Sequence, residues 1–181
     1  QRGYITPQEF NLHADHAQMD IFEQYFYDLN QFKRLPGNDT GYADMVNLIE
    51  DKISIFKKGP TDISDGVLLS ALPGGSDDVF YRVLNAWEKS HGKVVEEISC
   101  EDVYKTQHSP LTKATRNRPI YYKQDGKIYF RPTVEEYGFT PSKFEVNWIR
   151  RPRKPKWTYI VVNAKPLYNS TAVDKQDFEL H

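Results

Sequence analysis

Residues 4–32, YITPQEFNLHADHAQMDIFEQYFYDLNQF, form the stretch that decides the fold, because they predict one long amphipathic helix. Thr6 can cap its start, Pro7 suits the first helical position, and Glu9 can return a hydrogen bond to the cap. The apolar residues recur at steps of three or four, as one helix face requires, with some neighbours that widen the stripe: Phe10, Ala14, Ala17, Ile21, Tyr25, Leu29 and Phe32, then Met19, Phe22 and Phe26. At about 1.5 Å per residue the helix would be roughly 40 Å long, so we expect it to contact a partner as well as its own core.

A second helix should follow a turn at residues 35–37, Leu-Pro-Gly. Asn38 or Asp39 can cap it, and Lys-Lys-Gly-Pro at 57–60 has the cations, glycine and proline typical of a helix end. Its apolar residues again follow a helical spacing: Tyr42, Met45, Val46, Ile49, Ile53 and Phe56. The short connection predicts an antiparallel helical hairpin over residues 1–60, packed stripe to stripe.

Most of the remaining chain predicts β-strands, because apolar and polar residues alternate between turn residues. The predicted strands cover residues 67–72, 79–87, 93–98, 119–123, 127–131, 143–150 and 157–162. Gly126 suits a tight hairpin turn, and a short helix should lie between Ser99 and Pro110. The predicted fold is α+β, with a long N-terminal helical hairpin packed on a mostly antiparallel β-sheet.

Composition indicates a soluble chain of one domain, or of one domain with an appendage, since 39% of the 181 residues are hydrophobic and 27% are charged. Residues 61–168 would form the β-rich part of the same domain as the hairpin, and residues 169–181 a C-terminal extension that we expect to be incomplete. The single cysteine, Cys100, excludes an internal disulfide framework, and no apolar run is long enough for a membrane helix.

The sequence carries no motif typical of an enzyme. A phosphate-binding glycine loop, zinc-type cysteine spacing, a nucleophile elbow and an HExxH pair are all missing from it. His13, His16 and Asp20 could share a helix face and bind a metal, but the polar face of such a helix more commonly carries solvated histidines. Cys100 is more commonly a small buried residue than a nucleophile. We therefore expect no enzymatic activity, no cofactor and no metal.

Charge is distributed unevenly along the chain. The formal net charge is −9 for residues 1–104, +9 for residues 105–156 and −1 for residues 157–181. Cations alternate with tyrosine and tryptophan in the basic segment, residues 105–156. That segment could bind a nucleic-acid backbone, point its cations to solvent or dock on an acidic protein surface. The third interpretation is favoured, because the N-terminal part of the same chain carries the matching negative charge.

Residues 151–156, Arg-Pro-Arg-Lys-Pro-Lys, predict an exposed extended loop that contacts a partner. The cations repel one another, and the prolines exclude a central strand. The candidate interface residues lie around this loop and in the middle of the first helix: Ile21, Phe22, Tyr25, Phe26, Arg150, Arg151, Arg153, Lys154 and Lys156.

Several motifs are similar to those of a known family. They are residues 3–11 (GYITPQEFN), 17–26 (AQMDIFEQYF), 110–113 (PLTK), 118–121 (RPIY), 149–152 (IRRP) and 156–157 (KW). Together they span most of the chain and resemble structural proteins of short-tailed bacteriophages, the crAss-like and related marine podophages. The resemblance implies a virion protein without enzymatic activity, a ring or adaptor in the neck or tail that links the portal to the tail around the DNA channel. It implies no site residues.

The same resemblance implies partners and a location. The partners would be further copies in a homo-oligomeric ring, expected to be twelvefold, the portal, other neck or tail proteins, and passing DNA contacted without sequence recognition. The protein would assemble in the host bacterial cytoplasm and reside in the virion, with no membrane. Residues 1–104 of one copy would face residues 105–156 of the next, and high salt would slow ring formation. The alternative, from another class, is a nucleic-acid-binding module that uses the basic segment.

Overall fold

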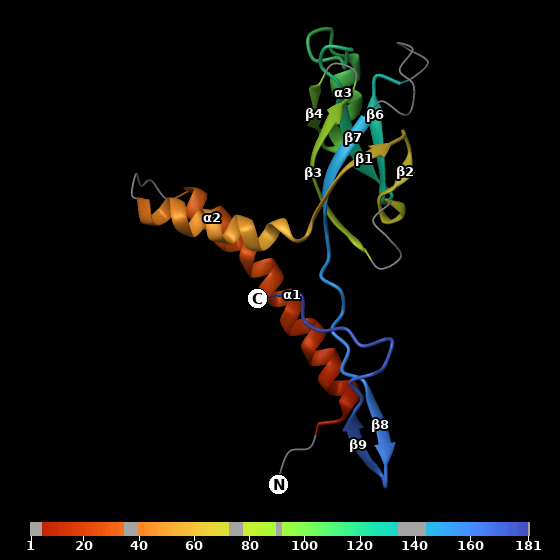
Figure 1. Cartoon of the computed structure of the whole chain (residues 1–181). Coiled ribbons are helices and arrows are strands. Elements are labelled where there is room, and N and C mark those ends of the chain that lie inside the picture. The colour runs from red at the N-terminus through yellow and green to blue at the C-terminus, as the bar shows by residue number, and fades with distance from the viewer. Residues whose placement is uncertain (1–4, 35–39, 73–77, 90–91, 134–143, 181) are drawn as a thin grey trace. The chain divides into compact units, whose positions relative to one another are not determined.

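The structure, a computed structural model, describes residues 5–34, 40–72, 78–89, 92–133 and 144–180 (Figure 1). It is mixed α+β, with one long N-terminal helix and a large, mostly antiparallel sheet. The chain divides into two compact units. We call Gln1–Phe56 with Pro152–His181 the helical unit, and Lys57–Arg151 the sheet unit. The predicted packing of a helical hairpin on the sheet stays a prediction.

The first helix begins where the sequence predicts, because its cap forms as expected. Helix α1 spans Pro7–Arg34, and Phe10 N–H donates to the Thr6 carbonyl at 2.9 Å. Thr6 N–H donates to a Glu9 carboxylate oxygen at 2.8 Å, and Glu9 N–H donates to Thr6 Oγ1 at 3.3 Å. This reciprocal pair is the predicted capping box.

The buried face of α1 is rotated from the predicted apolar stripe. Ala14, Gln18 and Phe22 are buried, whereas Ile21, on the predicted stripe, keeps 44% of its surface exposed. These three buried residues follow one another at a spacing of four, as one narrow helix face requires. A glutamine therefore occupies the centre of the buried face.

Helix α2 spans Thr40–Ser54 and contacts α1 at successive points along its length. Lys33 pairs with Glu50 at 2.6 Å, and the Phe22 ring meets the Phe56 ring edge-on at 5.0 Å. Ile53 and Phe56 are buried as expected. The predicted turn at residues 35–37 and the caps Asn38 and Asp39 lie outside the described residues, as does the side chain of Tyr42.

The predicted helix end at residues 57–60 is wrong, because a strand begins there. Strand β1 spans Lys57–Ile63, so the boundary predicted after residue 60 falls within it. Gly59 has φ 126°, and a Cβ there would lie 2.9 Å from the Val146 carbonyl oxygen. Pro60 is tolerated because β1 is an edge strand whose register shifts between Lys58 and Thr61.

Seven strands of the described chain form the sheet, in the order β1-β7-β3-β4-β5-β6-β2. Beyond β1 they are β2 Val67–Leu68, β3 Phe80–Glu88, β4 Lys93–Glu97, β5 Ile120–Gln124, β6 Lys127–Arg131 and β7 Phe144–Arg150. All neighbours pair antiparallel except β4 and β5. Alternation along β7 buries Phe144, Val146 and Trp148, as predicted. These side chains form the centre of the sheet unit's core.

The smaller elements differ from the expectations in detail. The strand expected over 67–72 shortens to β2 and continues as a 3-10 helix, η1, over Leu69–Ala71. The short helix before Pro110 is present as η2, Cys100–Asp102, and α3, Val103–His108. The β5–β6 turn uses Asp125 and Gly126, with φ 51° and 70°, as its spacing predicts.

The last predicted strand joins no part of the large sheet. It is β8, Tyr159–Val162, and it pairs only with β9, Lys165–Tyr168, among the described strands. The turn between them has positive φ at Asn163 and Ala164. Strand β9 is absent from the sequence prediction, because Ala164 gives no hairpin signal of the kind that glycine gives.

Candidate interaction surface

Two side-chain amides on α1 hold the C-terminal part of the chain against the helix. Asn11 Nδ2 donates to the Trp157 carbonyl at 3.1 Å, and Trp157 N–H donates back to Asn11 Oδ1 at 2.7 Å. Two turns further along, Gln18 Nε2 donates to the Arg153 carbonyl at 2.7 Å, and Glu179 N–H donates to Gln18 Oε1 at 3.1 Å. Each amide thus satisfies one backbone donor and one backbone acceptor.

This pairing explains why polar residues occupy the buried face of α1. An extended segment carries N–H and C=O groups that cost free energy when they are buried without partners. Asn11 and Gln18 are seven residues apart and therefore share a helix face, with the small side chain of Ala14 between them. Sequence reasoning missed both residues, because it searched that face for apolar side chains only.

Arg151, Lys154 and Lys156 of the proline-rich basic loop, residues 151–156, are exposed as predicted, but the loop does not project freely from the chain. Pro152 and Pro155 are buried. Arg153 N–H donates to a Glu179 carboxylate oxygen at 2.8 Å, and Lys154 lies 3.4 Å from the Asp15 carboxylate. Arg153 and Lys154 thus lie near carboxylates of their own chain, which reduces the repulsion among the loop's cations.

Lys156 adds a short stretch of strand pairing to this arrangement. Its backbone exchanges hydrogen bonds with that of Gln176, at 2.8 and 3.3 Å, and its ammonium group pairs with Asp174. The two extended segments around Lys156 and Gln176 therefore run antiparallel. Of the loop's cations, Arg153, Lys154 and Lys156 therefore already lie near carboxylates of their own chain.

Two other predicted interface cations belong to the sheet unit. Arg150 is buried, and its Nε lies 3.6 Å from Asp78, whose carboxylate also pairs with Lys58 at 3.0 Å. Arg151 is exposed; its guanidinium lies 5.9 Å from the centre of the Tyr81 ring. Arg150 is therefore an internal ion-pair residue, whereas Arg151 can be reached from solvent.

The predicted interface residues on α1 also separate. Phe22 is completely buried, with its ring 5.0 Å from those of Phe26 and Phe56, so it stabilises the helical unit and faces no solvent. Tyr25 and Phe26 are half-buried. Ile21 is exposed and can reach a partner.

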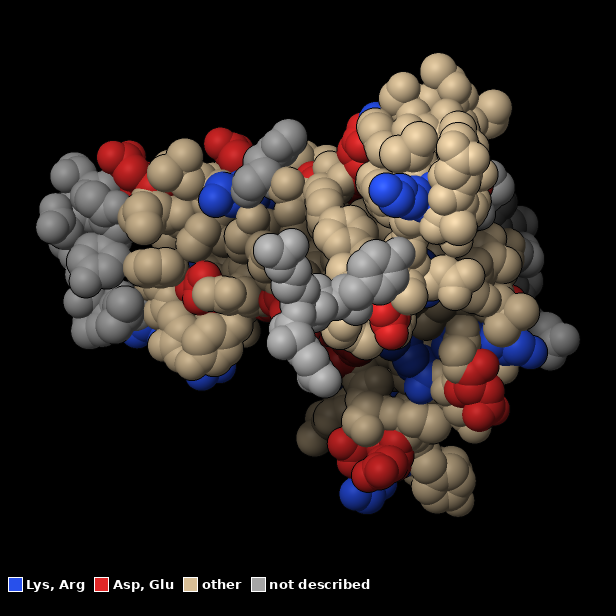
Figure 2. Space-filling model, turned by 90° about the horizontal axis from the view of Figure 1, so that it is seen from below, with Lys and Arg blue, Asp and Glu red and all other residues tan. Residues whose placement is uncertain are grey.

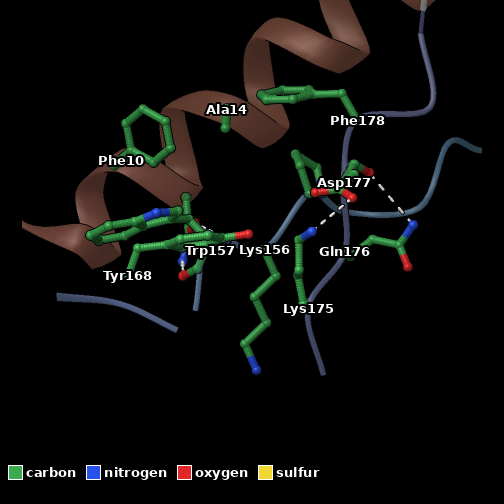
Figure 3. Close-up of a pocket in the computed structure, with 11 residues that line it drawn as sticks. Phe10, Ala14, Lys156, Trp157, Tyr168, Lys175, Gln176, Asp177 and Phe178 are labelled. Atoms are coloured by element: carbon green, nitrogen blue, oxygen red, sulfur yellow. Dashed lines mark hydrogen bonds and ion pairs between the residues drawn. The ribbon is translucent and has the colours of Figure 1, made fainter. Parts of the chain in front are cut away.

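An aromatic cluster lies between the start of α1 and the β8–β9 hairpin. The Trp157 ring stacks on Tyr159 at 5.8 Å and on Tyr168 at 6.1 Å, and meets Phe10 edge-on at 6.2 Å. Beside it is a hollow of about 210 Å³. Its lining includes Phe10 and Ala14 of α1 together with Trp157, Tyr168 and Phe178 (Figure 3). A second hollow of about 320 Å³ is lined by Ile5, Pro7, Phe10, Trp157 and Pro166.

The β8–β9 hairpin carries large apolar side chains into solvent. Those that are at least 43% exposed are Ile160, Val161, Val162, Leu167 and Tyr168. Polar side chains usually cover the solvent face of a two-stranded sheet. The hairpin is therefore a candidate surface for another protein chain.

Several cations of the basic segment pair with carboxylates of the acidic segment. Arg118 pairs with Glu96 at 2.8 Å, and Lys123 pairs with Glu97 at 2.7 Å. Lys154 contributes the similar contact with Asp15. On the face drawn in Figure 2, basic and acidic side chains are interspersed. Part of the split charge of the sequence is thus paired within one chain.

Glu97 is the most strongly bound of these carboxylates. Tyr121 Oη and Lys123 Nζ each donate to it at 2.7 Å. Burial alone would raise the pKa of Glu97, but these two hydrogen bonds, together with the positive charges of Lys123 and Arg82, hold its pKa below the ordinary value. Burial, together with the hydrogen bond to Glu97, raises the pKa of Tyr121. The group ties β4 to β5.

The residues considered for chemistry do not gather into a site. His13, His16 and Asp20 are exposed on α1, and the described residues hold no group of three or more potential ligands placed to bind a metal. Cys100 is exposed, which corrects the expectation of a buried residue. Among the described helices, none has the length and apolar character that a membrane crossing needs.

The contacts described above are the main evidence about the function of this chain. No protein-family model matches the chain, and no curated protein is significantly similar to it.

Proposed function

We propose that the chain is a structural protein without enzymatic activity that assembles with copies of itself into a ring or adaptor in the neck or tail of a tailed bacteriophage. It would link the portal to the tail around the DNA channel and reside in the virion. The proposal begins with the similarity of its motifs to structural proteins of crAss-like and related short-tailed phages.

The observation that carries the proposal is the apolar surface of the helical unit. Ile21 on α1 is 44% exposed, Leu48 on α2 is 56% exposed, and Val161 on β8 is 65% exposed. Single apolar side chains occur on any protein surface. We infer that the large ones on these three elements belong to surface that another chain covers, because contiguous apolar patches mark such contacts.

The proposal includes a helical hairpin formed by α1 and α2. The Lys33–Glu50 pair, the position of Lys52 over the Tyr25 ring and the Phe22–Phe56 contact follow one another in opposite chain directions. These contacts support an antiparallel arrangement of α1 and α2. We propose that the hairpin packs on a sheet in the assembled particle.

The contacts between copies should be mainly apolar. Since Arg118, Lys123 and Lys154 already pair with carboxylates of their own chain, they offer little net charge to a neighbour or to DNA. Exposed ion pairs contribute little free energy to binding, whereas buried apolar and aromatic side chains contribute most of it. This distribution supports an assembly role over the nucleic-acid-binding alternative.

Light scattering after size-exclusion chromatography tests the proposal. The purified chain should elute as an oligomer of defined mass, and its mobility should not change when short duplex DNA is added at moderate salt. A monomer that binds DNA with an affinity falling steeply as salt rises would instead show the nucleic-acid-binding function.

A further inference from the structure

The β8–β9 hairpin has two outer edges with different chemistry. On β9 the residue opposite Val161 is Pro166, which has no N–H group to donate. Lys165 adds a charge to the same strand. Proline and lysine are the residues that proteins use to prevent an edge strand from pairing with another chain. The β9 edge is therefore blocked.

Between Tyr159 and Val162 the outer edge of β8 pairs with no other described strand, and the register shows which of its groups point outward. Asn169 N–H donates to the Thr158 carbonyl at 2.9 Å, so this opposed pair turns its hydrogen-bonding groups inward. In an antiparallel ladder such pairs alternate with pairs whose groups point away. Thr158, Ile160 and Val162 thus face β9, whereas the N–H and C=O groups of Tyr159 and Val161 point to the outer edge.

The side chains of β8 are also suited to pairing. Ile160, Val161 and Val162 are β-branched, uncharged and 43–65% exposed. The edges of the large sheet are protected in other ways, since β1 contains Pro60 and a register shift and β2 is two residues long. Among the described strands no partner lies on the outer edge of β8 (Figure 1).

We propose that β8 pairs with β8 of a second copy of this chain, antiparallel and centred on Ile160. Tyr159 of each copy would then lie opposite Val161 of the other, and the outward N–H and C=O groups of these residues would bond to one another. Ile160 would lie opposite its own counterpart. The result is a four-stranded sheet in place of a two-stranded hairpin, which is only marginally stable by itself.

A second copy fits this edge because the contact is complementary to itself. A twofold axis through Ile160 presents the same donors, acceptors and apolar side chains from both copies, and β8 carries no charge to repel its counterpart. Neighbours within a ring instead meet through unlike faces. The β8 contact is therefore separate from ring closure and would join two rings, or two free chains.

A pair of cysteine variants tests the register, both made with Cys100→Ser to remove the exposed native thiol. In the proposed pairing the two copies of residue 160 have Cα atoms about 4.5 Å apart, within disulfide range. Val162→Cys is the matched control, since Val162 is on the same face and similarly exposed but would lie about 13 Å from its own counterpart. Under mild oxidation, Ile160→Cys should form the intermolecular disulfide at least about tenfold faster than Val162→Cys. Equal rates would overturn the proposal.

A proline variant tests the backbone bonds. In the Ile160→Cys background, Val161→Pro removes a donor that points away from β9, whereas Val161→Thr keeps it. The proline variant should lose most of the crosslinking and the threonine variant should retain it. Crosslinking that survives Val161→Pro would contradict the strand pairing. If Val161→Pro disrupts the hairpin itself, the comparison of Ile160→Cys with Val162→Cys still tests the proposal.

Discussion

Gln18 is the residue on which docking of the C-terminal segment depends most. It is buried, and it satisfies the Arg153 carbonyl and the Glu179 N–H. Gln18→Leu keeps the volume but leaves both backbone groups unpaired, at a cost of about 1–3 kcal/mol each. Urea unfolding followed by Trp fluorescence should show this loss of stability.

The control for that variant is Gln24→Leu, at an exposed position of the same helix. It should change the free energy of unfolding by less than about 0.5 kcal/mol. An equal midpoint for Gln18→Leu and the wild-type protein would show that the amide does not hold the segment.

Glu97 sets a pH dependence for the sheet unit. Because its pKa is lowered on folding, its contribution is fully present above the unfolded pKa, about 4.5, and is lost as the pH falls through the folded pKa. Glu97→Gln should be less stable at pH 7 and should lose less stability than the wild-type protein on acidification below about pH 4.5. Thermal unfolding across a pH series measures both effects.

Glu101→Gln removes an exposed carboxylate from η2 and serves as the comparison. If Glu97→Gln and Glu101→Gln showed the same pH profile, the hydrogen bonds from Tyr121 and Lys123 would not be responsible.

At the scale of elements, α1 carries two kinds of residue: those that stabilise the helical unit and those that can contact a partner. Phe22→Ala should cost about 3–5 kcal/mol, because the ring is fully buried against Phe26 and Phe56. Ile21→Ala, at the next position, should leave the melting temperature almost unchanged and weaken assembly instead. Calorimetry and light scattering on both variants measure the two effects.

The reverse result, a large loss of stability from Ile21→Ala and little from Phe22→Ala, would mean that the helix face is assigned wrongly. The sequence predicts a wide stripe that includes Ile21 together with Ala14 and Phe22, because apolar residues recur across that whole width. The extended C-terminal segment docks on the narrower face around Ala14, where the side-chain amides of Asn11 and Gln18 bond to its backbone.

The elements with strong local signals are the ones that sequence reasoning places well. Thr6 and Glu9 define the start of α1, and Gly126 defines the β5–β6 turn. Residues 57–60 give a wrong prediction, because Gly-Pro is typical of a helix end. Here it lies in β1, an edge strand whose shape depends on contact with β7. Contacts between distant segments, such as Asn11 with Trp157, leave no local pattern in the sequence.

At the scale of the whole molecule, part of the charge that is separated along the sequence meets its opposite within the same chain. Glu96, Glu97 and Asp15 bind cations that follow them in the chain. Attraction of acidic residues 1–104 of one copy to basic residues 105–156 of the next, and slower assembly at high salt, stay predictions, and these internal pairs reduce the charge that such a contact can use. Apolar contacts remain as the proposed cause of association.

Negative-stain electron microscopy of the purified chain tests the central claim, that this is a self-assembling structural protein. The account predicts closed rings of uniform diameter that form without DNA and become fewer when Ile21 is replaced by alanine. A field of single particles of monomer size, at protein concentrations where the wild-type chain is fully folded, would contradict it.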